Sequence, residues 1–213
     1  MEELHEPLAQ YLASRPQPPG KMSFTEFLNW CDEDTWAEWV DGEVIILTPA
    51  SLRHQEIKMF LAGIMSEFTR YHHLGRVIDA PFVVRLPGNL KRGREPDIIV
   101  IRTEQLPLLK ETYFDGSPDV IVEIISPESY ARDRLTKYHE YETAGVKEYW
   151  LLDPDQHHNI FYRLGEDDSY HPVPYKEGIF YSEALPGFWL KPAWLWQKPL
   201  PSLLTVMSEL GIK

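Results

Sequence analysis

The chain has 213 residues, of which 43% are hydrophobic and 25% are charged. This composition is typical of one globular domain and excludes a disordered or fibrous chain. The formal net charge of −12 disfavours strong nonspecific binding to nucleic acid, which depends on Lys and Arg contacts to phosphates. A local basic groove is compatible with this total, and simple surface solvation of the basic residues is an equal alternative. The candidates for such a groove are Lys91, Arg92, Arg94, Arg132, Arg134 and Lys137.

The cysteine content and the N-terminal segment indicate the cellular compartment. A single cysteine, Cys31, excludes an intramolecular disulfide framework and suits a reducing cytoplasm. Residues 1–20 contain four prolines and lack the apolar core of a signal peptide. No stretch approaches the ~20 apolar residues that span a bilayer. We therefore expect a cytoplasmic protein with an N-terminal arm over 1–20 and a single domain over 21–213.

The first part of this domain is expected to form a helix, a hairpin and a long helix. Ser23 and Glu26 have capping-box spacing, which marks a helix start. Asp-Gly at 41–42 separates two apolar-rich segments and predicts a two-residue hairpin turn. Apolar residues then recur at helical spacing over 57–68. One face of this long helix should be buried, and Gly75 is its expected stop.

The middle of the chain alternates between strand and helix patterns. Residues 76–86 predict one strand with an irregularity at Pro81. The segments 97–101 and 119–125 are β-branched and apolar almost throughout, as are strands that are buried on both faces of a sheet. A helix over 131–145 and a strand after it would complete a βαβ crossover.

The C-terminal part predicts short antiparallel strands over 158–185 and a final helix over 201–211. Tyr141 and the aromatic residues near it are expected to pack a helix against the sheet and not to stack on bases. The sequence contains no internal repeat or interdomain linker. These elements together predict an α/β fold with a mixed central sheet, an N-terminal helix and hairpin, and C-terminal antiparallel strands.

Two carboxylates occur where the predicted strands are most apolar. Asp97 follows Pro96 at the start of one strand, and Glu123 lies among aliphatic residues in the next. Burial of an ionised carboxylate is costly unless the group is paired, hydrogen-bonded or bound to a metal. Mg²⁺ suits a position between two carboxylates, because it keeps several waters and also takes substrate phosphate. A structural ion pair of Glu123 with Arg132 or Lys137 is the alternative that spacing alone leaves open.

Six motifs between Ser23 and Pro154 carry a family resemblance. They read MSFTEFL, EWVDGEV, TPASLRH, EPDIIVI, VEIISPES and RDRLTKYHEYETAGVKEYWLLDP. With the order of the elements, they resemble the PD-(D/E)XK nuclease core, and more closely a widespread bacterial family of restriction endonucleases in that superfamily. The last motif is long and specific, whereas Pro-Asp followed by a strand Glu would be a weak signal. The resemblance implies a restriction-endonuclease-like core, in which helices flank the mixed sheet.

The resemblance also implies a metal-dependent endonuclease that hydrolyses phosphodiester bonds, with DNA as the expected substrate. Asp97 and Glu123 would hold Mg²⁺, or Mn²⁺ as a substitute, and the backbone carbonyl of Ile124 would supply a further oxygen. Such a metal lowers the pKa of a bound water and neutralises charge on the scissile phosphate. A homodimer is expected as well, because two-fold symmetry suits an enzyme that cuts a duplex.

The catalytic lysine is expected at an unusual position. The superfamily's lysine, two residues after the acidic residue, is replaced here by Ile125. The closer family implies Lys137 instead, which would orient the attacking water or stabilise the phosphate. It also implies Glu38 as a third carboxylate, ahead of its rival Glu56. His54 matches a family position as a supporting residue, and a locally hydrogen-bonded histidine is an equal interpretation.

Two other functions stay open at the level of the sequence. A catalytically inactive module that keeps the nuclease fold for binding or assembly is favoured by Ile125 and by the acidic charge. The presence of Asp97, Glu123 and Lys137 opposes that hypothesis. A phosphatase or another metal hydrolase that uses the same acidic pair ranks last.

Overall fold

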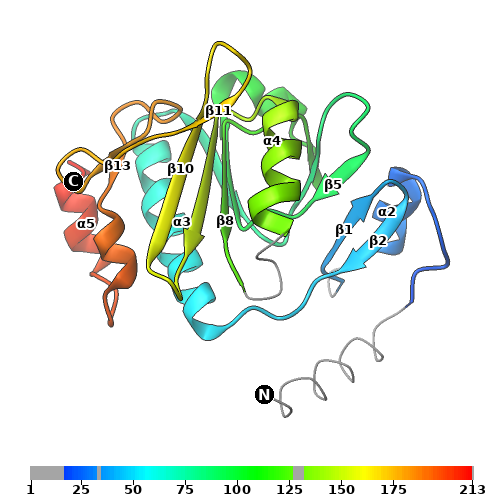
Figure 1. The fold of residues 1–213 in the computed structure, drawn as a ribbon, viewed down its shortest axis with the longest axis horizontal. Coiled ribbons are helices and arrows are strands. Elements are labelled where there is room, and N and C mark those ends of the chain that lie inside the picture. Colours follow the sequence, from blue (N-terminus) through cyan, green and yellow to red (C-terminus); the bar gives the residue numbers. More distant parts are fainter. Residues whose placement is uncertain (1–16, 33–34, 127–131, 213) are drawn as a thin grey trace.

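The computed structural model describes residues 17–32, 35–126 and 132–212. Its centre is a six-stranded mixed sheet with the strand order β11-β10-β9-β8-β6-β3 (Figure 1). In chain order these strands are β3 (Gly75–Asp79), β6 (Ile98–Arg102), β8 (Val120–Ile124), β9 (Glu148–Asp153), β10 (His158–Leu164) and β11 (Tyr170–Pro172). Strands β8 and β9 pair in parallel, as the predicted crossover requires, and the other pairs are antiparallel.

A five-stranded sheet with the order β2-β1-β5-β4-β7 lies beside the central sheet. Its strands are β1 (Ala37–Val40), β2 (Glu43–Ile46), β4 (Val83–Arg85), β5 (Arg92–Arg94) and β7 (Tyr113–Asp115). The predicted hairpin joins β1 to β2. Both of its turn residues have positive φ, 51° at Asp41 and 92° at Gly42, as a type I′ turn requires. A separate pair is formed by β12 (Phe180–Tyr181) and β13 (Trp189–Leu190).

The helices agree with the prediction except at the C-terminal end of the long helix. They are α2 (Phe24–Trp30), α3 (Leu52–Tyr71), α4 (Tyr138–Ala144) and α5 (Leu203–Glu209), with the 3₁₀ turns η1 (Thr103–Leu108) and η3 (Pro192–Trp196) and the π-helical turn η2 (Arg132–Lys137). The capping box is confirmed, because Ser23 and Glu26 each accept a hydrogen bond from the other's backbone N–H. Gly75 is not the stop of α3. The chain leaves the helix through His73, whose φ is 55°, and Gly75 begins β3.

The central sheet is buried on both faces, as its apolar strands predicted. Successive side chains of a strand point to opposite faces. Val100 and Val122 therefore pack in the cluster that includes α3, whereas Ile99 and Ile121 pack on the α4 side with Tyr141. Helix α3 and helix α4 thus cover opposite faces (Figure 1), which gives the expected α/β layers.

The prediction of a single strand over 76–86 is wrong. The chain forms β3 in the six-stranded sheet, breaks at Pro81, and forms β4 in the five-stranded sheet. Proline has no N–H to donate to a ladder, so the strand ends there and the chain crosses to the second sheet. No helix in the described residues is long and apolar enough to cross a membrane.

Candidate active site

One pocket collects side chains from both sheets, α3 and the η2–α4 helix. Four carboxylates and two ammonium groups line it, so acidic groups are in excess. The charged and imidazole side chains are His54, Lys58, Glu95, Asp97, Glu123, Asp133 and Lys137, and Ile124 also lines the wall. The pocket therefore contains Asp97, Glu123, Lys137 and His54, which were predicted from the sequence. Glu95, Lys58 and Asp133 are additional.

Lys137 lies at the centre of this cluster and is only 3% exposed. Its Nζ is 2.8 Å from Oε1 of Glu123, 3.1 Å from Oε1 of Glu38 and 3.3 Å from Oδ1 of Asp133. Burial lowers the pKa of Lys137, but the three carboxylates outweigh burial and raise it above its usual range. The interpretation of Lys137 as a solvated helix lysine is therefore wrong, and the ammonium stays charged.

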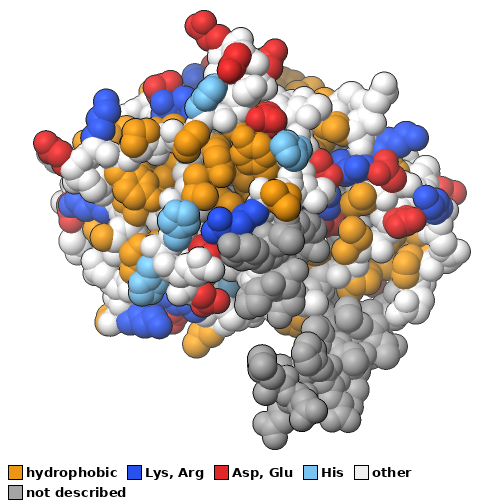
Figure 2. Space-filling model, in the orientation of Figure 1, with side chains coloured by type: hydrophobic (Ala, Val, Ile, Leu, Met, Phe, Trp, Pro, Cys, Tyr) orange, Lys and Arg blue, Asp and Glu red, His pale blue; other side chains and the backbone are white. Residues whose placement is uncertain are grey.

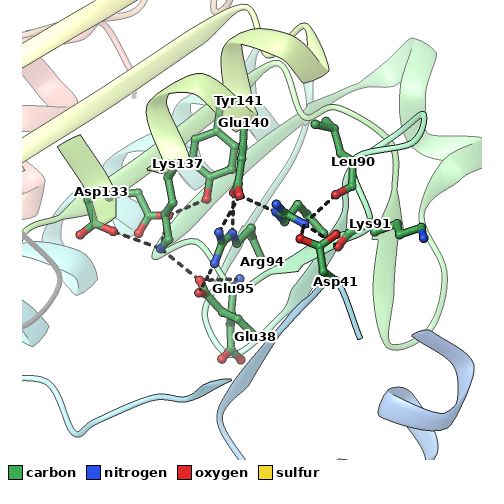
Figure 3. Close-up of polar contacts among 12 residues, drawn as sticks. Glu38, Asp41, Leu90, Lys91, Arg94, Glu95, Asp133, Lys137, Glu140 and Tyr141 are labelled. Carbon is green, nitrogen blue, oxygen red and sulfur yellow. Dashed lines mark hydrogen bonds and ion pairs between the residues drawn. The ribbon is translucent and has the colours of Figure 1, made fainter. Parts of the chain in front are cut away.

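Arg94 extends the cluster toward the hairpin. It is 1% exposed and lies 2.7 Å from carboxylate oxygens of both Glu38 and Glu140 (Figure 3). Arg92 contacts Glu140 as well, and it pairs with Asp41 at 2.8 Å. Glu38 of β1, Arg94 of β5 and Glu140 of α4 thus form a chain of ion pairs that connects the three elements. Arg94 is thus a buried structural cation, and it does not belong to a basic surface groove.

Glu38, which the resemblance favoured, is completely buried in this network. Its rival Glu56 is half-exposed and pairs with Arg53 on the surface of α3. Successive side chains of β1 point to opposite faces, so Ala37 and Trp39 pack against α2 and Glu38 points to the other face. The register of β1 with β5 then sets Glu38 beside Arg94.

Asp97 lies just before β6 and faces the end of β8. Its Oδ2 accepts a hydrogen bond from the backbone N–H of Ile124 at 2.7 Å and is 3.1 Å from Nε2 of His54. His54 is buried in the first turn of α3, where its own N–H donates to the N-cap Ser51. The backbone of His54 is thus capped by Ser51, whereas its ring contacts Asp97; its supporting role in the site stays a prediction.

Glu123 uses one oxygen for its contacts. Oε1 accepts hydrogen bonds from Lys137 at 2.8 Å and from the hydroxyl of Tyr141 at 2.7 Å. In the described chain, Oε2 has no such partner. Burial, opposed by Lys137 and reinforced by Asp133 and Asp97, raises the pKa of Glu123 to about 8. Tyr141 packs on the sheet as predicted, but its hydroxyl also belongs to the site, which the sequence analysis missed.

Glu95 is the second residue that sequence reasoning missed. It is 8% exposed, and its Oε2 has no hydrogen-bond partner in the described chain. In Figure 3 only its backbone N–H is joined to Glu38. Burial, and then the charge of Glu38, raises the pKa of Glu95 to about 8. The signals in the sequence were its place two residues before Asp97 and at the start of the EPDIIVI motif.

The described side chains do not form a ready-made metal site of three or more His, Cys, Asp or Glu ligands. Their chemistry nevertheless suits a hard divalent cation. Asp97, Glu123 and Ile124 line the same pocket. Two carboxylates and a backbone carbonyl are oxygen donors, and Mg²⁺ takes such oxygens while it keeps several waters. The orphaned Oε2 of Glu95 adds a further donor with no other partner.

Comparisons with known proteins agree with this architecture. Residues 24–193 match the model of the Uma2 family, which is described as "Putative restriction endonuclease". The chain belongs to the Uma2 family. The resemblance predicted from its motifs is confirmed, and Uma2 membership makes it a member of a nuclease family.

The fold of this Uma2 chain is similar to a solved structure. A crystal structure described as "a putative nuclease belonging to DUF820" from Anabaena variabilis superposes with a TM-score of 0.69 at 17% sequence identity. The match covers 82% of this chain and 97% of that chain, and it confirms the restriction-endonuclease-like fold. Among curated proteins, no sequence matches the chain.

Replacement of Arg94 by methionine should destabilise the protein strongly. The change keeps much of the side-chain volume but leaves Glu38 and Glu140 buried with one cation fewer each. Loss of one partner from a buried ion pair costs about 3–5 kcal/mol, measurable by urea unfolding near neutral pH. Arg70→Met is the control, because Arg70 is exposed and forms an ion pair with Glu67 on the surface of α3. Equal effects of the two substitutions would contradict the buried network.

Replacement of Glu95 by glutamine should change how stability depends on pH. The folded pKa of Glu95, about 8, lies above its ordinary value of 4.5, so the proton is bound more tightly in the folded state. The resulting stabilisation is complete below the ordinary pKa and is lost as the pH rises toward 8. Glu95→Gln should therefore gain Tm over the wild type as the pH rises from about 5 to about 8.5 with chelator present.

Glu43→Gln removes the same formal charge from an exposed side chain and is the matched control for Glu95→Gln. A Tm difference between Glu95→Gln and wild type that stays constant across this pH range would show that Glu95 is not perturbed by its burial.

Proposed function

We propose that the protein is a metal-dependent endonuclease that hydrolyses phosphodiester bonds in DNA. The observation that carries this proposal is the buried ammonium of Lys137, held 2.8 Å from Glu123 in the pocket that Asp97 also lines. A nuclease-family fold alone would not support an activity. Burial of charged groups in an otherwise apolar interior lowers the free energy of unfolding unless they are fully paired. A catalytic role would explain why the chain keeps them there.

Each residue has a distinct role in this proposal. Asp97, Glu123 and the carbonyl of Ile124 hold Mg²⁺ or Mn²⁺. When bound, the metal supplies Lewis-acid stabilisation of phosphate charge and an acidified water. Lys137 donates a hydrogen bond to the attacking water or to the phosphoryl oxygens.

Three further residues support these groups. Glu38 and Asp133 keep Lys137 charged and in place. His54 orients Asp97 through its Nε2. Such contacts fix the geometry before substrate binds, so less reorganisation is needed during the reaction.

The charge distribution bears on how DNA would bind. Lys and Arg side chains on the face in Figure 2 are scattered among acidic ones and do not form a stripe, and the chain carries a formal net charge of −12. Weak nonspecific binding is therefore expected. Recognition would depend on the pocket itself and on a two-fold dimer that presents two pockets to the two strands.

The test is cleavage of supercoiled plasmid DNA by the full chain with Mg²⁺ or Mn²⁺. Nicking or linearisation should require the metal and should stop with chelator. Asp97→Asn should lower the rate by about 100-fold or more, because loss of one group that acts on the transition state costs that much. The amide can still accept the Ile124 N–H, so the fold should be retained, which a melting curve checks.

Asp167→Asn is the matched control. Asp167 is an exposed carboxylate that pairs with His171 and does not line the pocket, so its substitution should leave cleavage unchanged. Absence of metal-dependent cleavage of DNA by a folded wild-type chain would contradict the proposal and favour the catalytically inactive binding or assembly module.

A further inference from the structure

Lys58 is a second buried lysine in the pocket, and it differs from Lys137 in its partners. It lies on α3 and is 7% exposed. Its Nζ donates to the backbone carbonyl of Ala80 at 3.1 Å. Within residues 17–32, 35–126 and 132–212, no carboxylate forms an ion pair with it. An ammonium group has three hydrogens to donate, and its burial with one neutral acceptor is costly.

The groups around Lys58 also have unused hydrogen-bonding capacity. His54 lies one helical turn before Lys58, on the same face of α3. Its Nδ1 is buried and has no partner among the described residues, and the same is true of Oε2 of Glu95. All three residues are buried and line the same pocket. Unmet polar groups of this kind in a native interior indicate a site that a ligand or water completes.

The two lysines of the pocket are suited to different tasks. Lys137 is committed to Glu38, Glu123 and Asp133. Those contacts fix its position and leave it little freedom to follow a substrate. Lys58 has hydrogens to donate and, among the described residues, no carboxylate in ion-pair contact; Glu95 interacts with its charge only at longer range. An incoming anion would accept the free hydrogens. A phosphodiester supplies acceptor oxygens and a negative charge at once.

We propose that Lys58 binds a phosphate of the nucleic-acid backbone and positions it against the Asp97–Glu123 wall of the pocket. This inference rests on the proposed endonuclease function and names a substrate-positioning residue for it. Lys58 thus holds the phosphate from the α3 wall, while Lys137 keeps its carboxylate partners in place on the η2–α4 wall.

The experiment measures binding of a short fluorescein-labelled DNA duplex to the full chain by fluorescence anisotropy, with Ca²⁺ as the divalent cation. Lys58→Gln should weaken binding about tenfold, the equivalent of one charge-assisted hydrogen bond. It should also lower the slope of log Kd against log salt concentration by about one, as loss of one phosphate contact does. Lys58→Arg should restore most of both.

Two further variants separate binding from folding. Lys58→Met keeps the length of the side chain without its charge, and it should reproduce the loss of affinity and of salt dependence if Lys58→Gln melts early. Lys191→Gln is the matched control, because Lys191 pairs with Glu209 near the C-terminal helix and does not line the pocket. It should bind the duplex as the wild type does.

Failure of this inference is distinguishable from failure of the proposed function. A wild type that cleaves DNA, with Lys58→Gln and Lys58→Met equal to it in affinity and salt slope, overturns the role of Lys58 and leaves the endonuclease intact. A wild type that binds the duplex through Lys58 but never cleaves overturns the endonuclease and keeps the phosphate contact. A wild type that binds no duplex overturns the inference itself.

Discussion

Burial of the Lys137 ammonium is the constraint on which the rest of the site depends. An ammonium group that is 3% exposed would be unfavourable without compensation, and Glu38, Glu123 and Asp133 supply it from three different elements. Each of these carboxylates needs further partners in turn. Arg94 meets that need for Glu38, and Tyr141 donates to Glu123.

This network connects the five-stranded sheet to the central sheet and to helix α4. Strand β1 contributes Glu38, strand β5 contributes Arg94, and α4 contributes Glu140, which accepts hydrogen bonds from Arg94. Apolar contacts also join the two sheets, because Val84 of β4 and Phe114 of β7 pack in one cluster with residues of the central sheet. The buried ion pairs add directional contacts between them. Such contacts specify one relative placement, because a misplaced charge would be left buried and unpaired.

Much of this architecture was predictable from local patterns. The capping box at Ser23, the Asp-Gly turn and the apolar strands around Asp97 and Glu123 each depend on neighbours in sequence. The break at Pro81 was visible, but its consequence was not, because a change of sheet depends on contacts distant in sequence. The roles of Glu95 and Lys58 were hidden for the same reason. Glu95 opens the EPDIIVI motif without a role assigned to it there, and Lys58 lies in none of the motifs. Only tertiary packing brings the two residues into the pocket.

The central claim is that Asp97 and Glu123 bind a divalent cation in the pocket that Lys137 also lines. A crystal of the full chain soaked in Mn²⁺ and measured for anomalous scattering tests it most directly. The account predicts a peak between Asp97 and Glu123, within reach of the Ile124 carbonyl, with the Lys137 ammonium still beside Glu123. No peak at this place, with Asp97 held only by His54 and the Ile124 N–H, would contradict the metal-dependent mechanism.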